Sequence, residues 1–246
     1  VADGAGLLAL CAAALAAWVR FPVLPTYDSL FSLVWGQEVL AGHAPGFADF
    51  RAPTEHPLWL LLSVISAAFG SPGARVMTAV AVGSFVLLVV GVYLLARLMA
   101  GRVAAVVAAV IMVPRLDFGF WAAFAFLDIP FAACVVWAAL LEARQPRRGG
   151  WVWALLIAAG MLRPEGWLIA GVYGIWMVWG RPLRSWWRTG LAVVAAPVVW
   201  MLVDLLVTGK PLFSFTYTTG EAAKLGRQRT LLDLPRPGHR RPGRAA

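Results

Sequence analysis

The chain has 246 residues, of which 61% are hydrophobic and 13% are charged, and its formal net charge is +9. A soluble domain carries about 25% charged residues, so the composition excludes an ordinary soluble protein and indicates an integral membrane protein. The positive charge does not indicate nucleic-acid binding, because most arginines stand in short segments between apolar runs, where they set the orientation of membrane helices.

Apolar runs follow one another along the chain at residues 4–19, 57–70, 76–96, 103–114, 118–141, 151–162, 166–180 and 189–207. A helix needs about 20 apolar residues to span a bilayer. The first run has no basic segment before it and no clear small-residue cleavage site after it, which predicts a retained span rather than a signal peptide. The second run is short for a span and is typical of a re-entrant or interfacial helix.

A polar, acidic segment at residues 21–56 separates the first two runs. Within it, residues 29–40 (SLFSLVWGQEVL) have the spacing of an amphipathic helix that lies along the membrane interface. We therefore expect residues 21–75 to form a long first loop outside the cytoplasm, with interfacial helices.

The arginines predict the orientation. If the N-terminus is cytoplasmic and residues 57–70 do not cross, the cytoplasmic connections contain Arg97, Arg102, Arg144, Arg147, Arg148, Arg181, Arg184 and Arg188. The opposite side then receives nearly all acidic residues, namely Asp28, Glu38, Asp49, Glu55, Asp117, Asp128 and Glu165. If residues 57–70 crossed, with the N-terminus still inside, these arginines would all face outward, which the positive-inside rule rejects.

This orientation requires two helix breaks. Residues 103–141 must form two spans that turn within residues 114–128, and residues 151–180 must form a short hairpin that turns at Arg163-Pro164. Proline favours the second break because it lacks a backbone donor and restricts the preceding residue. A single tilted helix over part of residues 151–180 is the alternative.

Residues 1–210 are therefore expected to form an all-α polytopic membrane domain with about seven transmembrane helices. Residues 211–246 are expected to form an extracytoplasmic loop and a basic tail. From Arg236 onward the sequence (RPGHRRPGRAA) has the composition of a disordered linker. An unstructured tail and a truncated chain both explain it, and the resemblance described below favours truncation.

Polar side chains gather on the outer side, namely Asp28, Glu55, His56, Asp117, Asp128, Arg163 and Glu165. Each has a structural explanation of its own. Asp28 or Asp128 could cap the helix that follows it, and Arg163 could pair with Glu165 across a tight turn. Polar groups near a membrane are costly to bury, so their convergence on one side indicates a functional site.

Several chemistries are excluded by the residues present. The chain has three histidines and no zinc-ligand spacing, and it contains no GxSxG, Walker A or dinucleotide-binding motif. Cys11 and Cys134 lie within apolar runs and indicate no disulfide framework. What remains is carboxylates, one histidine and a few arginines, which suit a reaction with an anionic leaving group.

The order of three sequence segments resembles a known superfamily. "YDS…WGQEVLAGHAP…FRAPTEHPLWLLL…FG…AR" is followed by "FLDIPFAA" and "MLRPEGWL". This order is similar to that of the GT-C membrane glycosyltransferases, in particular the protein O-mannosyltransferase and aminoarabinose-transferase-like group (glycosyltransferase family 39). The segment "TGKPLFSFTYTTGEAAKLGR" resembles actinobacterial members, and the similarity covers about residues 4–232.

The resemblance implies transfer of a sugar, with inversion, from a polyprenyl-phosphate carrier on the non-cytoplasmic face. Asp28 matches the catalytic Asp of the first outer loop, and Asp128 matches the acid before the fourth span. Residues 55–57 match an acidic-basic-proline motif whose basic residue approaches the carrier phosphate. The chain departs from the pattern at His56, where some relatives have Lys, and at Leu58, where a second proline is often found. Family members usually have further spans, which favours a truncated actinobacterial member.

We therefore expect a multi-pass plasma-membrane enzyme that transfers a mannose-type sugar to a protein, glycan or lipid acceptor outside the cytoplasm. Asp28 is the expected general base. His56 and Arg163 adjoin apolar helices at the outer interface and are expected to hold the donor phosphate. The supporting residues are Glu55, Asp128 and Glu165.

No cofactor is implied beyond the lipid-linked sugar, which is a co-substrate. No metal-ligand set is predicted, although a lone carboxylate such as Glu55 leaves the need for a divalent ion open. A transporter or lipid-handling protein is the main alternative, and inverted repeats or paired broken helices would favour it. A non-catalytic remnant of the enzyme is a further alternative.

Overall fold

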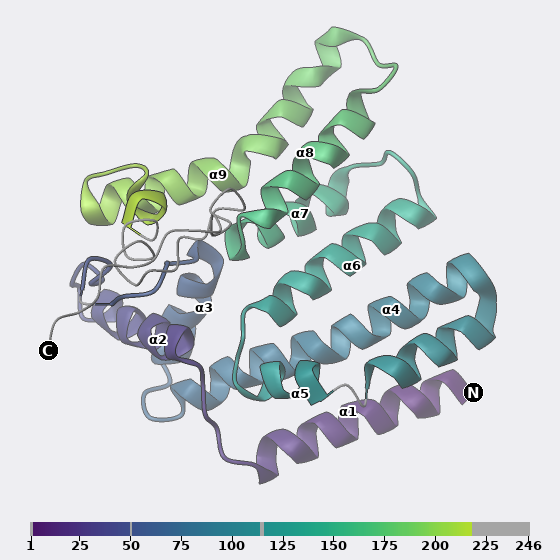
Figure 1. Ribbon diagram of the computed structural model, residues 1–246, viewed down its shortest axis with the longest axis horizontal. Coiled ribbons are helices and arrows are strands. Elements are labelled where there is room, and N and C mark those ends of the chain that lie inside the picture. The colour runs from purple at the N-terminus through teal and green to yellow at the C-terminus, as the bar shows by residue number, and fades with distance from the viewer. Residues whose placement is uncertain (1, 50, 114–115, 218–246) are drawn as a thin grey trace, which may run out of the picture.

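The computed structural model describes residues 2–49, 51–113 and 116–217, which form helices and no strand (Figure 1). In chain order the helices are α1 (Ala2–Arg20), α2 (Tyr27–Leu40), α3 (Pro57–Ala67), α4 (Gly73–Met112), α5 (Leu116–Ala123), α6 (Asp128–Arg144), α7 (Gly150–Leu162), α8 (Glu165–Val178), the short 3-10 helix η1 (Leu183–Ser185) and α9 (Trp186–Thr208). The expectation of an all-helical fold is confirmed for these residues. Of the loop and basic tail predicted at residues 211–246, residues 218–246 lie outside the described residues.

Helix α4 consists of two arms that meet at Gly101. This glycine has φ 83° and ψ −175°, a backbone conformation that glycine adopts far more readily than any other residue. The chain turns there, within the connection predicted at residues 97–102 (Figure 1). The first arm, residues 73–100, is about 42 Å long at the rise of an α-helix, whereas the second arm, residues 102–112, is about 16 Å long.

Two helices, α4 and α9, are long and apolar enough to cross a membrane by length and composition. Four shorter apolar helices accompany them, in α1, α3, α7 and α8. The apolar runs of the sequence predicted about seven spans, which is more than these two candidates. The difference arises because turns cut the apolar runs into helices such as α7 and α8, of 13 and 14 residues, and a helix needs about 20 residues to span a bilayer.

The expected helix breaks are present. Helix α7 ends at Leu162 and α8 begins at Glu165, so the alternative of one tilted helix over this stretch is wrong. The turn expected within residues 114–128 is also found, and it contains the additional short helix α5. Helix α3 has 11 residues and is too short to cross a bilayer alone, as its run predicted.

One buried cluster joins the helices at the end of the molecule where α2 and α3 lie. It consists of Leu33, Trp59, Met77, Ala81, Ala125, Leu127 and Leu162. These residues come from α2, α3, α4, the turn before α6 and the C-terminal end of α7. The cluster therefore holds Asp128 and Arg163 close to α2 and α3, because each directly follows one of its members in the chain.

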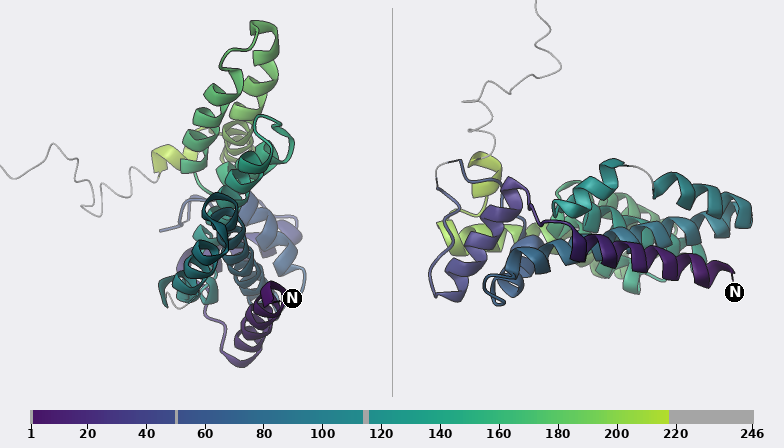
Figure 2. Two further views of the ribbon diagram at one scale, coloured as in Figure 1. Left: turned by 90° about the vertical axis from the view of Figure 1, so that its right-hand side faces the viewer. Right: turned by 90° about the horizontal axis from the view of Figure 1, so that it is seen from below.

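The charged turns lie away from this end. The α4 turn, the α6–α7 connection and the α8–α9 connection carry the arginines described above, and all three lie far from α2 and α3 (Figure 1). Figure 2 shows α2 and α3 at one end of the molecule and the N-terminus at the other. Large apolar side chains on the faces of α1, α8 and α9 are exposed, including Leu8, Leu168 and Leu206. Exposed apolar surface of this kind is typical of membrane or protein contact.

Candidate functional site

The N-terminus of α2 is fixed by Thr26 and Ser29. Thr26 is the N-cap, since its hydroxyl accepts from the Ser29 backbone N–H at 3.3 Å. The Ser29 hydroxyl donates to the Ala125 carbonyl at 2.7 Å, and the Thr26 N–H donates to the Phe124 carbonyl at 2.8 Å. These bonds dock the first turn of α2 onto the segment that precedes Asp128.

Asp28 lies in this first turn and does not cap the helix, so the structural explanation of Asp28 as the cap is wrong. Its side chain reaches the surface, but the protein around it desolvates the carboxyl and raises its pKa. Among the residues that the structure describes, no hydrogen bond or ion pair engages this carboxyl. Asp28 is therefore a carboxylate available to a ligand at this end of the molecule.

Arg163 lies between two carboxylates at the α7–α8 turn. Its Nη1 donates to Asp128, while Nη2 and Nε donate to the two oxygens of Glu165 at 2.8 and 3.2 Å. The pairing of Arg163 with Glu165 proposed as a structural explanation is therefore present, and Asp128 joins it. A guanidinium has five N–H donors, so these bonds leave two for a further ligand. The Arg163 side chain is 33% exposed, which makes the remaining donors accessible.

His56 lies beside Arg163 as a neutral side chain. Burial is the main reason that the pKa of His56 is lowered to about 4, and the positive charge of Arg163 is the second reason. Its ring interacts with the backbone of Leu162 and lies 5.7 Å from the Trp200 ring, measured between centroids. Its Nδ1 atom is buried and has no hydrogen-bond partner. At neutral pH His56 therefore offers an acceptor and no charge.

Glu55 takes part in a separate buried cluster. Ser214 donates from its backbone N–H to Asp204 at 3.0 Å and places its hydroxyl at 2.5 Å from Asp204 Oδ1 and in contact with Glu55 Oε1. All three side chains are buried. Burial is the main reason that the pKa of Glu55 is raised to about 8, and the hydrogen bond to Asp204 is the second reason.

Sequence reasoning missed this cluster. Asp204 was the single charge in an otherwise apolar run, and an ionisable residue inside such a run is a functional or structural signal by itself. Ser214 carried no comparable signal. Glu55 therefore anchors the segment after α9 to the first loop rather than facing Arg163.

The predicted site residues thus fall into three groups. Asp128, Arg163 and Glu165 are in contact, and His56 is close enough to sense the charges of Arg163 and Glu165. The remaining residues lie apart from them, because Glu55 belongs to the buried cluster with Asp204 and Ser214, and Asp28 stands alone in the first turn of α2. The side chain of Asp117 lies outside those that the structure describes. Within the described residues, no group of three or more His, Cys, Asp or Glu side chains could hold a metal ion.

The fold and the site together define an all-helical protein with two helices able to cross a membrane by length and composition, and with a polar site at the end formed by α2, α3 and the α7–α8 turn. No protein-family model, curated protein or solved structure matches this chain.

Proposed function

We propose that the chain is an inverting membrane glycosyltransferase of the GT-C type, which moves a mannose-type sugar from a polyprenyl-phosphate carrier to an acceptor hydroxyl. The observation that carries the proposal is the presence of two separate features at the α2–α3 end of the molecule. Arg163 has spare N–H donors beside neutral His56, and Asp28 has a raised pKa and no side-chain partner among the residues that the structure describes.

The chain is proposed to cross the plasma membrane several times, with this site on the outer face. The separation of the arginine-rich turns from α2 and α3 supports this orientation (Figure 1). Helices α7 and α8 are shorter than the about 20 residues that span a bilayer. About seven crossings therefore require that polar turns at the membrane surface extend some of the helices.

The proposed reaction needs one proton acceptor and one anion-binding group. The acceptor oxygen attacks the anomeric carbon and its proton passes to Asp28, while the carbon–oxygen bond to the carrier breaks and the phosphate leaves with the electron pair. Desolvation raises the pKa of Asp28, and a carboxylate with a raised pKa is a stronger general base than an ordinary one. The phosphate needs no acid to protonate it, so one carboxylate is sufficient.

Arg163 is proposed to bind the carrier phosphate through its remaining donors, because guanidinium and phosphate form charge-assisted hydrogen bonds. Asp128 and Glu165 hold the guanidinium in place, and they also reduce its net attraction for an anion. His56 is proposed to line the site as a neutral side chain, since its Nδ1 atom is buried. Glu55 supports the site indirectly, by fixing the loop that carries His56.

The test uses the full chain in liposomes with radiolabelled polyprenyl-phosphate sugars, and it follows release of polyprenyl phosphate. The wild-type chain is expected to release it from a mannose donor, and Asp28→Asn is expected to slow release by about 10²–10⁴-fold, the usual contribution of a general base. Arg163→Gln is expected to raise the KM for the donor about tenfold, since hydrogen bonds to charged groups contribute about 1.5–3 kcal/mol.

Two matched variants serve as controls. Asp49→Asn removes another exposed carboxylate of the first loop and should leave transfer unchanged. Thr26→Ala removes the actual N-cap and should cost about 1 kcal/mol of stability with little change in the rate per folded molecule. Absence of turnover with every polyprenyl-phosphate sugar, or equal rates for Asp28→Asn and wild type, would contradict the proposal.

A further inference from the structure

A surface rich in arginine and tryptophan, the Trp-Arg surface, lies where the α6–α7 connection meets the α8–α9 connection. It is formed by residues 142–151 and 176–188, which contain most of the arginines described above. The same two segments contribute exposed tryptophans, namely Trp151, Trp176, Trp179, Trp186 and Trp187. Positive charge and indole rings therefore occur together at this end of the molecule, far from α2 and α3 (Figure 1).

Contacts between the two connections hold this surface together. The Arg147 Nη1 atom donates to the Trp179 carbonyl at 3.0 Å, and the Arg181 Nη2 atom donates to the Arg147 carbonyl at 3.5 Å. The guanidinium carbon of Arg147 also lies 4.1 Å from the centroid of the Trp176 ring, which is the geometry of a cation–π contact. The two connections therefore form one continuous surface, although they are far apart in the chain.

Little negative charge offsets the arginines of this surface. Glu142 is the only acidic residue in the two segments, and its carboxylate already accepts hydrogen bonds from two aromatic side chains and one backbone N–H. Arg144, Arg148 and Arg184 are exposed. Among the residues that the structure describes, no hydrogen bond, ion pair or ring contact engages the side chains of these three arginines. Their guanidiniums are therefore available to an anion from outside the chain.

The tryptophans favour a position of this surface at the boundary between membrane and water. Helix α9 begins at Trp186 and is long and apolar enough to cross a membrane by length and composition. A helix that crosses has its first turn at the bilayer surface. The side chains of Trp151 and Trp179 are 79% and 70% exposed. Exposed tryptophan is typical of the head-group level of a bilayer, because its ring is apolar and its N–H is polar.

We infer that the Trp-Arg surface binds the head groups of anionic phospholipids. The lipid phosphates bind Arg144, Arg148 and Arg184 through charge-assisted hydrogen bonds, and the indole rings lie among the head groups beside them. This inference goes beyond the proposed glycosyl transfer and does not depend on it, because the surface contains none of the candidate site residues.

The apolar surface next to the arginines favours a lipid over another anion. Leu191, Val194 and Val198 of α9 are exposed, and at this spacing they continue along one face of the helix from Trp187. A phospholipid matches both parts, since its acyl chains contact this apolar face and its phosphate contacts the arginines. A nucleic acid would match only the arginines.

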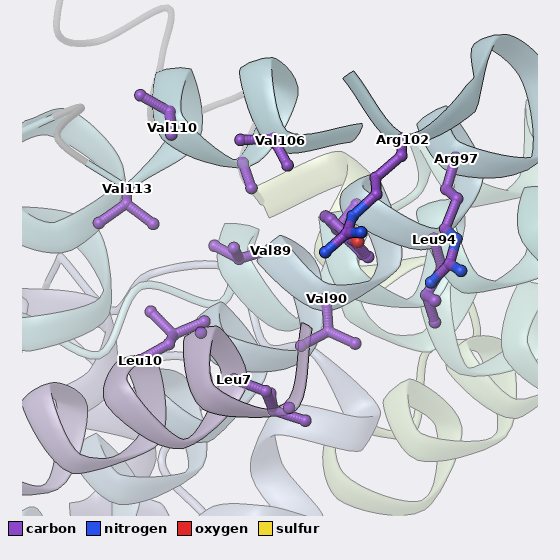
Figure 3. Close-up of a pocket in the computed structure, with 14 residues that line it drawn as sticks. Leu7, Leu10, Val89, Val90, Leu94, Arg97, Arg102, Val106, Val110 and Val113 are labelled. Atoms are coloured by element: carbon purple, nitrogen blue, oxygen red, sulfur yellow. The ribbon is translucent and has the colours of Figure 1, made fainter. Parts of the chain in front are cut away.

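Arg97 and Arg102 are not part of the Trp-Arg surface. They line an apolar groove between α1 and the two arms of α4 (Figure 3), and each already has an interaction within the chain. Replacing Arg102 therefore removes a positive charge on the same predicted side of the membrane without changing the proposed lipid-binding surface.

The test measures binding of phosphatidylglycerol and phosphatidylcholine to the full chain in detergent by native mass spectrometry. Phosphatidylglycerol is expected to bind more tightly than phosphatidylcholine. Arg148→Gln and Arg184→Gln are each expected to weaken binding of phosphatidylglycerol about fivefold, the effect of losing one basic residue near an anionic lipid. Binding of phosphatidylcholine by these variants should stay as it is in the wild type, because this lipid has no net charge.

Arg102→Gln is the matched control and should bind both phospholipids as the wild type does. Arg20→Gln, in the exposed last turn of α1, is a second control, and the thermal unfolding midpoint of each variant shows whether it is folded. Equal affinity of the wild type for the two phospholipids, or equal weakening by the control variants, would overturn the inference. Displacement of phosphatidylglycerol by a DNA duplex at far lower concentration would also overturn it, since the surface would then belong to nucleic acid.

Discussion

The contacts among Glu55, Ser214 and Asp204 require a shared proton. The Ser214 hydroxyl has one proton and can donate to only one carboxylate at a time, but its oxygen contacts both. The second contact needs a proton on a carboxyl group, and the raised pKa of Glu55 identifies Glu55 as the residue that holds it. Protonated Glu55 then donates to Ser214, and Ser214 donates to Asp204.

This arrangement predicts a pH dependence of stability. The folded pKa of Glu55, about 8, is above its value in the unfolded chain, so the stabilisation is complete below about pH 4 and is lost as pH rises through the folded pKa. Between about pH 5 and pH 8, the free energy of unfolding is expected to fall by up to about 1.4 kcal/mol per pH unit, the limit for one proton. Thermal unfolding in detergent across this range measures it.

Glu55→Gln should flatten this dependence, because the amide donates a hydrogen bond at every pH. The control is Glu38→Gln, which makes the same change in a side chain that accepts from the Gly46 backbone at 2.9 Å. Its pH profile should stay like that of the wild type. A profile of Glu55→Gln as steep as the wild-type one would show that another group takes up the proton.

At the scale of elements, the α7–α8 hairpin depends on a close approach of two backbones. A Cβ atom added to Gly166 would lie 2.6 Å from the Gly160 backbone nitrogen and 2.7 Å from its Cα atom. Backbone atoms cannot move aside as a flexible side chain can. The glycine therefore allows the tight turn that places Arg163 next to Glu165.

Gly166→Ala is accordingly expected to destabilise the protein by about 1–3 kcal/mol, the usual cost of overpacking. Gly171→Ala, in the same helix, is the control, because nothing lies within 4 Å of its added Cβ atom. Alanine favours a helix by about 1 kcal/mol over glycine, so this variant should be as stable as the wild type or more so. Thermal unfolding of the two variants distinguishes them, and equal effects would argue against the close approach.

At the scale of the whole molecule, the proposed orientation can be tested by labelling. After replacement of Cys11 and Cys134, single cysteines at the exposed positions Ala48, Gln145 and Leu183 should report opposite sides. A reagent that does not cross the membrane should label position 48 from outside intact cells, and positions 145 and 183 only after permeabilisation, as the positive-inside rule requires. Outside labelling at position 145 would reverse the orientation and the placement of the candidate site.

The sequence by itself determined the helical class and the positions of the main turns. These features depend on local chemistry: long uncharged runs favour helices, Pro164 interrupts one, and the arginines stand in the connections between runs. The grouping of Arg163 with Glu165 was also accessible, since the two are only two residues apart. The number of helices long enough to cross a membrane could not be predicted from the sequence. This number depends on where each helix ends and not only on where apolar residues occur.

Only the tertiary structure decided the roles of the individual polar residues. Thr26 and Asp28 are both good capping residues, and the choice between them was made by how the α2 terminus docks onto Phe124 and Ala125. The partner of Glu55 is Ser214, 159 positions away in the chain, and no local pattern connects residues at that separation. Burial and the charge of Arg163 make His56 neutral, because desolvation and nearby charge are properties of the packed molecule and not of the residue type.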